Sequence, residues 1–207
     1  SDLECSFSDV GQRNQVFQQI EARLVARAKE RLDAYRLTHR RPAWCRLESL
    51  LVERLTEAGF AQVTTPTIMA RGHLERMGVD VHHPLSSQVF WLDHKTCLRP
   101  MLAPHLYFLL KDLLRIWEHP VRIFEVGSCF RKETKGSQHT TEFTMLNIVE
   151  MGLPLEDRRS QLEHLTDLVM TVAGITNYNL VSTSSEVYGE TIDIEGNDGM
   201  ELGSAAM

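Results

Sequence analysis

The chain has 207 residues, of which 43% are apolar and 24% charged, and its net charge is −6. This composition fits one globular domain with a sizeable core. No apolar run approaches the ~20 residues that span a bilayer, and the acidic first residues lack the apolar core of a signal peptide, so we expect no membrane partner. The cysteines form no C-x-x-C pair, which predicts reduced thiols and a cytoplasmic location. They are Cys5, Cys45, Cys97 and Cys129.

The basic charge is concentrated near the start of the chain. Residues 10–41 hold eight Lys or Arg and three acidic residues, so this stretch is +5 and the rest carries −11. Apolar residues at four-residue spacing predict an amphipathic helix that is capped near Ser8 or Asp9. We therefore expect residues 1–41 to form a basic helical segment. Arg23, Arg27 and Arg31 share that spacing on another face, which is either a solvated face or a stripe for a nucleic-acid backbone. The apolar positions are Val16, Ile20, Leu24, Ala28 and Leu32.

The remaining residues, 42–207, are expected to form one α+β domain. Helices and strands do not alternate in a β-α-β manner, so an antiparallel sheet flanked by helices is the predicted architecture. Pro42 suits the first turn of a helix, and Gly59 suits its end. The predicted elements are helix 42–59, strand 60–65, helix 71–77, a hairpin of 88–92 with 96–98, helix 100–117, strands 121–130 and 143–151, helix 154–173, and strands 179–181, 187–194 and 200–206.

Two strand-like runs between residues 124 and 151 flank a polar loop that carries four chemically apt side chains. The guanidinium of Arg131 suits phosphates, because its planar fork donates two hydrogen bonds at once. The carboxylate of Glu133 suits the exocyclic amine of a base, and the ring of Phe143 suits its face, a contact worth roughly 1–3 kcal/mol. With His139, this set predicts a nucleotide site. The alternative is an ordinary hairpin with a charged tip.

The pattern Arg131-x-Glu133, a loop and His139-x-x-x-Phe143 resembles motif 2 of the class II aminoacyl-tRNA synthetases. The helix, Gly-Phe, strand and proline of residues 42–66 resemble motif 1, which implies a homodimer. From about Phe7 onward, the chain is similar to the catalytic domain of the pyrrolysyl-tRNA synthetases. The similarity is closest to the bacterial type, in which a small tRNA-binding N-terminal domain is a separate protein. The runs that carry this wider resemblance are 97–104 (CLRPMLAP), 142–147 (EFTMLN) and 187–189 (VYG).

The resemblance implies ATP-dependent activation of pyrrolysine and its ligation to an amber-suppressor tRNA. In such a site Arg131 is the catalytic residue at the α-phosphate, Glu133 holds adenine, His139 faces the outer phosphates and Phe143 stacks on the base. The stripe of Arg23, Arg27 and Arg31 would bind the tRNA backbone.

The resemblance also implies a magnesium ion that accompanies ATP, held by Glu201 and Ser204. On a regular strand, residues 201 and 204 point to opposite faces. A bulge or a twist imposed by the metal is therefore required if both residues bind the ion.

The matching amino-acid pocket would accept pyrrolysine or a related N-ε-acyl-lysine. Four of its residues lie at i, i+3, i+4 and i+7 of the helix after Pro100, a spacing that is also typical of core. The amide of Asn147 would bind the substrate's side-chain amide, and Tyr188 would act as a mobile lid. The implied pocket residues are Met101, Ala103, Leu106, Tyr107, Leu110, Asn147, Val149 and Tyr188.

Some features depart from the family pattern. The third class II motif, a Gly-rich run with an Arg, is missing, so we expect a further strand-helix unit after Met207, and the activity of these residues alone is uncertain. His105 stands where the family commonly has Asn. The alternatives are a non-catalytic class II-like paralogue that binds an amino acid or nucleotide, and another class II synthetase, such as the phenylalanyl or phosphoseryl type.

Overall fold

The computed structural model describes residue 7 and residues 9–38, 41–132, 140–185 and 188–207. The chain forms two compact units, residues 1–46 and residues 47–207. None of the described helices has the length and hydropathy needed to cross a lipid bilayer.

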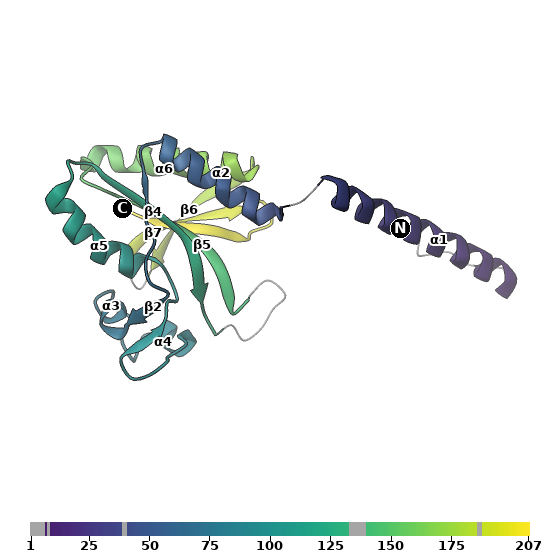
Figure 1. The fold of residues 1–207 in the computed structure, drawn as a ribbon, viewed down its shortest axis with the longest axis horizontal. Helices are drawn as coiled ribbons and strands as arrows, with labels where there is room; N and C mark the ends of the chain where they lie inside the picture. Colours follow the sequence, from purple (N-terminus) through teal and green to yellow (C-terminus); the bar gives the residue numbers. More distant parts are fainter. Residues whose placement is uncertain (1–6, 8, 39–40, 133–139, 186–187) are drawn as a thin grey trace. The chain divides into compact units, whose positions relative to one another are not determined.

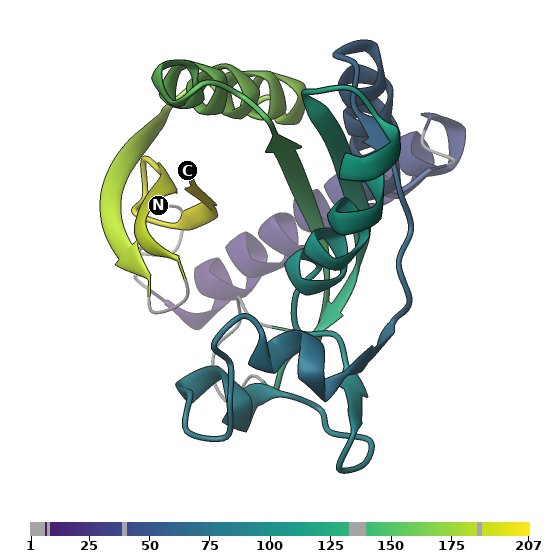
Figure 2. The same cartoon turned by 90° about the vertical axis from the view of Figure 1, so that its left-hand side faces the viewer.

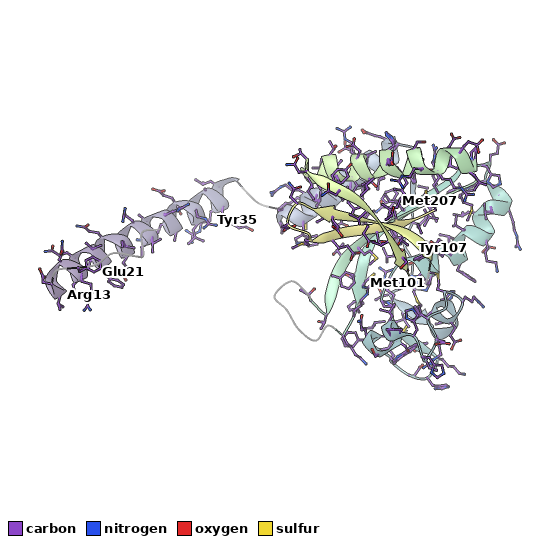
Figure 3. All side chains as sticks on the ribbon, turned by 180° about the vertical axis from the view of Figure 1, so that it is seen from behind. Arg13, Glu21, Tyr35, Met101, Tyr107 and Met207 are labelled. Atoms are coloured by element: carbon purple, nitrogen blue, oxygen red, sulfur yellow. The ribbon has the colours of Figure 1, made fainter. Side chains whose placement is uncertain are left out.

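The first unit is dominated by helix α1 (Val10–Thr38). The side chain of Asp9 caps it, because the carboxylate Oδ1 accepts a hydrogen bond from the Gln12 N–H at 2.8 Å. The predicted helix and its cap at Asp9 are therefore confirmed. The side chains of α1, with Arg13, Glu21 and Tyr35 labelled, are drawn in Figure 3.

The centre of the second unit is a long antiparallel pair, β4 (Val121–Phe130) and β5 (Glu142–Met151). The pairing is unbroken from Val121 opposite Met151 to Phe130 opposite Glu142. The short strand β1 (Ala61–Gln62) lies parallel to β4 on its other side. The central strands are thus confirmed, whereas the predicted strand 60–65 shrinks to two residues.

Helices cover both faces of this sheet, as Figure 1 shows. Helix α5 (Ala103–Ile116) packs its leucines on one face. Helices α2 (Ala43–Glu57) and α6 (Arg158–Ala173) supply residues to a second core on the opposite face. A 3-10 turn (Leu155–Asp157) precedes α6. Gly174, at a φ of 73°, ends α6 in the left-handed conformation that glycine adopts without strain.

A smaller layer contains β2 (Ile68–Ala70), α3 (Arg71–Glu75), α4 (Pro84–Gln88) and β3 (Thr96–Leu98). Strand β3 pairs with β2, which had not been predicted. The predicted hairpin of 88–92 with 96–98 is therefore wrong in its first arm, where only a Trp91–Cys97 bridge forms.

The cause lies at Pro84, which starts α4 and so removes residue 88 from the expected strand. His83 stabilises this helix start, since its Nδ1 accepts from the Leu85 N–H at 3.1 Å. The predicted turn between the two arms of the hairpin does form. Asp93 Oδ1 stabilises it by accepting hydrogen bonds from the Lys95 and Thr96 N–H groups at 2.7 Å each.

The last sheet is an antiparallel meander of β6 (Tyr178–Ser185), β7 (Gly189–Gly196) and β8 (Glu201–Ala206), seen in Figure 2. Its three strands were predicted, although β6 is longer than the expected 179–181. The α+β class and the helix-covered antiparallel sheet are confirmed, with parallel β1 as the exception.

Candidate active site

One face of the β4–β5 pair carries three of the residues that the sequence assigned to binding, Phe143, Asn147 and Val149. Residues directly opposite each other in an antiparallel pair point to the same side, and so do residues two apart on one strand. The face covered by α5 therefore carries the opposed pairs Ile123–Val149, Glu125–Asn147, Gly127–Met145 and Cys129–Phe143. Arg131 follows directly at the end of β4.

Arg131 is held beside Phe143 at the open end of this face. Its guanidinium carbon lies 5.3 Å from the centroid of the Phe143 ring. Its Nε donates to the Pro100 carbonyl oxygen at 3.0 Å, and its backbone N–H donates to Thr141 O at 3.1 Å. Among the described residues no carboxylate pairs with Arg131, so its terminal N–H groups are available for an anion such as a phosphate.

The helix residues assigned to the pocket divide into a buried floor and an accessible rim. Ala103, Leu106 and Leu110 are 4%, 0% and 2% exposed, and the two leucines share one buried cluster with Val149. Tyr107 is 37% exposed. Residues at this spacing therefore belong to the hydrophobic core, with Tyr107 at its edge. Figure 3 labels Tyr107 and Met101.

The side-chain amide of Asn147 is half-buried between the apolar residues of β5. It makes no hydrogen bond to any other described residue. Because it is neither fully buried nor paired with another described residue, this amide is accessible to a ligand.

Tyr188, just before β7, lies near Tyr107 of α5. Burial, followed by the electrostatic effect of Tyr107, raises the pKa of Tyr188. The predicted lid residue is therefore beside the predicted pocket residue Tyr107.

A bulge in β8 places the side chains of Glu201 and Ser204 on the same face of the strand, although they are three residues apart. Asp193 is opposite Ser204 and Glu195 is opposite Glu201, with a register shift that leaves Leu202 as the extra residue. Because Asp193 and Glu195 are two apart on β7, their partners Glu201 and Ser204 point to one face. The bulge required by the sequence argument is confirmed.

This pair of oxygen donors fits magnesium, which keeps several waters and binds through one or two carboxylates together with substrate phosphates. The described residues contain no group of three or more His, Cys, Asp or Glu able to hold a metal by themselves. A complete protein cage is therefore not present in the described part of the chain.

The site described above leaves out two groups of predicted residues. Glu133 and His139 lie outside the described residues. Arg23, Arg27 and Arg31 belong to the first unit, where they are exposed on α1.

The sequence argument missed a buried ion pair beneath the site. Arg99 and Glu125 are 4% and 1% exposed, and Nη1 of Arg99 donates to Glu125 Oε1 at 2.7 Å. Thr65 completes the network, because its N–H and Oγ1–H donate to the two carboxylate oxygens at 3.0 and 2.7 Å. The sequence did contain a signal for this pair, because Arg99 and Glu125 each stand inside an apolar run. Charged residues in such runs are buried only when they are paired.

His105 was noted only as a departure from the family pattern. It is 8% exposed, its Nδ1 has no hydrogen-bond partner among the described residues, and its ring packs against His73 with centroids 5.1 Å apart. Burial lowers the pKa of His105, and His73 and Arg99 lower it further against the opposing effect of Glu125. Burial, and then Arg76, lowers the pKa of His73.

Comparisons with known proteins give a family match over more than half of the chain. Residues 32–177 match the family "tRNA synthetases class II core domain (F)". The chain is 33% identical over 144 residues to a lysine–tRNA ligase of Thioalkalivibrio sulfidiphilus, a match that covers 68% of this chain and 25% of that protein. It is 29% identical over 143 residues to the Staphylococcus aureus lysine–tRNA ligase, again covering 68% and 25%. The chain thus spans about a quarter of these relatives.

Solved structures give a similarity over nearly the whole chain. A pyrrolysyl-tRNA synthetase structure from Desulfitobacterium hafniense is 50% identical with a TM-score of 0.85, covering 99% of this chain and 73% of that one. A second structure from this organism, of PylSc, is 49% identical with a TM-score of 0.82, covering 99% and 71%. The family match over residues 32–177, with which the fold agrees, shows that this chain belongs to the class II core domain family of the tRNA synthetases.

Proposed function

We propose that this chain supplies the catalytic core of a ligase that activates pyrrolysine, or a related N-ε-acyl-lysine, with ATP and transfers it to a cognate tRNA. The observation that carries the proposal is the shared face of β4 and β5, where Arg131 and Phe143 lie at one end and Asn147 lies further along. Phe143 and Asn147 are four residues apart, or about 13 Å, which leaves room for an elongated side chain between them.

The first step is attack of the amino-acid carboxylate on the α-phosphorus of ATP. A P–O bond to the carboxylate forms while the bond to pyrophosphate breaks. The carboxylate is already ionised at neutral pH, so no general base is needed. Arg131 stabilises the charge that develops on the α-phosphate, and Phe143 orients the adenine by stacking. In the second step, a tRNA hydroxyl attacks the acyl carbon, and AMP leaves with the bonding electron pair.

Glu201 and Ser204 are the residues that would hold magnesium. When bound, the ion neutralises negative charge on the ATP phosphates. The support is their common orientation across the β8 bulge.

The pocket chemistry favours an acylated lysine over lysine itself. None of the eight predicted lining residues is acidic, and Glu125, opposite Asn147, is neutralised by Arg99. A lysine ammonium would therefore be desolvated without a partner, whereas an amide meets the free amide of Asn147. Shape selects among acyl groups only weakly, since one methylene is worth about 1–3 kcal/mol, so we expect other N-ε-acyl-lysines to be accepted. Strict rejection of them in a charging assay would contradict this pocket.

We further propose that the enzyme acts as a cytoplasmic homodimer whose α1 stripe binds tRNA, with a separate tRNA-binding protein as a possible helper. The support is the chemistry of the first unit. Arg23, Arg27 and Arg31 are exposed at regular spacing on α1, as a phosphate-binding surface requires. In the second unit, the free thiols of Cys97 and Cys129 suit a reducing compartment.

Amino-acid-dependent exchange of pyrophosphate into ATP tests the proposal, measured on the longest available form of the polypeptide. We expect exchange with pyrrolysine and N-ε-acyl-lysines, none with lysine or phenylalanine, and none with the Arg131→Ala variant. Binding of ATP without exchange would instead identify the non-catalytic paralogue. Exchange with phenylalanine or phosphoserine would identify another class II synthetase.

A further inference from the structure

The guanidinium of Arg99 joins segments that are far apart in the chain. Besides its ion pair with Glu125, Nε donates to the Ser128 carbonyl oxygen at 2.7 Å, and Nη1 donates to Thr65 O at 2.9 Å and to Thr65 Oγ1 at 3.0 Å. One buried side chain thus connects the segment after β1, the segment after β3 and strand β4.

The backbone of Arg99 extends this junction into the site. Its N–H donates to Thr67 O at 3.0 Å, and its carbonyl accepts from the Phe130 N–H at 2.9 Å. The next carbonyl, that of Pro100, is the acceptor for Nε of Arg131. The position of the Arg131 guanidinium therefore depends on where Arg99 holds this short segment.

The same segment leads directly into the amino-acid side of the site. Met101 and Ala103 follow within four residues and begin the predicted pocket. Arg99 is hydrogen-bonded to β4 through both its side chain and its backbone carbonyl. The position of Arg99 therefore affects both the start of α5 and the orientation of Arg131.

Gly127 provides the space that the guanidinium occupies. A Cβ at this position would stand 2.3 Å from Nη2 of Arg99 and 3.3 Å from Oε1 of Glu125. No side chain larger than hydrogen fits there unless Arg99 moves, so residue 127 offers a second way to disturb the anchor.

We propose that Arg99 is a positioning residue that holds the phosphate-binding Arg131 and the start of the amino-acid pocket in register through its buried network with Glu125, Thr65 and Ser128. The proposal rests on the proposed activation reaction. It goes further, because Arg99 itself touches neither the nucleotide nor the amino acid.

A second ion pair, which joins β4 to β5, provides a control. Arg122 pairs with Glu150 across β4 and β5, and Gln161 donates to the same carboxylate at 2.8 Å. Arg122 and Glu150 are even-numbered and so point to the face opposite Asn147. This pair shares strand β4 and the charge type with the Arg99 network, but its hydrogen bonds to described residues, Glu150 and Gln161, do not lead to Arg131.

The test compares Arg99→Lys and Gly127→Ala with Arg122→Lys, each checked for folding by circular dichroism and thermal unfolding. We expect the exchange kcat to fall about 100-fold in the first two variants, as misplacement by about 1 Å can cause, and to stay unchanged in Arg122→Lys. A folded Arg99→Lys variant with wild-type exchange would overturn the proposal. So would an equal loss in the Arg122→Lys control, since the effect would then be a general loss of stability.

A readout without activity keeps this test separate from the proposed function. In wild-type protein, the Nε–H of Arg131 should exchange slowly with solvent by nuclear magnetic resonance, because Pro100 accepts it. Arg99→Lys should speed that exchange and weaken ATP binding in calorimetry, and Arg122→Lys should change neither. If wild-type protein shows no pyrophosphate exchange, the proposed function fails and these two measurements still decide the role of Arg99. Rapid exchange of the Arg131 Nε–H in wild-type protein would refute that role without any variant.

Discussion

In the proposed pocket, Asn147 is the residue that we expect to select the substrate. Its amide has no partner among the described residues, while the carboxylate opposite it is saturated by Arg99 and Thr65. The polar group left for a ligand here is therefore neutral. A neutral amide favours amide-bearing substrates without attracting an ammonium ion.

Replacing Asn147 by alanine tests this assignment. We expect kcat/KM for an N-ε-acyl-lysine in pyrophosphate exchange to fall about tenfold, or about 1.4 kcal/mol, because one hydrogen bond to the substrate is lost. The KM for ATP should not change. Thr144→Ala, an exposed position on the opposite face of β5, is the control that leaves the amide in place. An equal effect on ATP binding would assign Asn147 to the nucleotide instead.

His105 makes folding stability depend on pH in a predictable direction. The pKa values of His105 and His73 are lowered in the folded state, so the unfolded chain binds more protons. The stabilising effect of their neutral forms is fully present above the ordinary histidine pKa of about 6.5 and is lost as pH falls through the lowered folded-state values. Arg99, Arg76 and Glu125 are the charged groups that face this pair.

The measurement is the unfolding midpoint in urea at pH 7 and at pH 5. Stability of the wild-type protein should fall between these values by more than that of His105→Asn, which cannot take up the proton. Comparing the two proteins cancels the contribution of carboxylates common to both. A pH dependence that is identical in both proteins would show that His105 does not contribute.

At the scale of elements, the β8 bulge is the feature that lets Glu201 and Ser204 act together. Without the extra residue Leu202, a spacing of three would place the two side chains on opposite faces. The bulge therefore converts an unsuitable sequence spacing into a shared surface.

A double-mutant cycle tests whether the two residues share one ion. Glu201→Gln and Ser204→Ala should each weaken magnesium-dependent ATP binding in calorimetry, and their effects should be coupled by about 0.5–3 kcal/mol because they contact the same ion. Leu202→Ala is the control between them. Strictly additive effects would show that the two side chains act separately.

The elements also show how far local sequence signals reach. Strands β4 and β5 were predictable because alternation and turn residues are local properties. The β2–β3 pairing was not, because Ile68–Ala70 is a short run whose partner is separated from it in the chain. Pro84 starts a helix that includes Gln88, the first residue of the expected strand, and its preference for the first helical turn would have predicted that start.

At the scale of the whole molecule, basic and acidic residues are distributed unevenly between the two units. The first 46 residues hold the basic helix α1, while the second unit carries the reaction site and most of the acidic residues. This separation allows an acidic protein to bind an anionic nucleic acid through one segment.

Charge removal on α1 tests that division. Arg27→Ala with Arg31→Ala should lower tRNA affinity and reduce the salt slope of binding by about 1.5, since two phosphate contacts are lost. Pyrophosphate exchange without tRNA should be unaffected. The matched control is Lys29→Ala with Arg36→Ala, which removes the same charge from the opposite side of the helix. Equal losses in both double variants would indicate only a general electrostatic effect.

The sequence by itself determined the main elements, the side of β5 that carries Asn147 and Val149, and the resemblance to a synthetase family. These depend on periodicity and on short motifs, which are local in the chain. Only the tertiary structure decided that Glu125 is paired with Arg99, that Tyr188 contacts Tyr107, and that a bulge aligns Glu201 with Ser204. The physical reason is that partners of buried polar groups and strand registers are set by packing between distant segments, which no local pattern records.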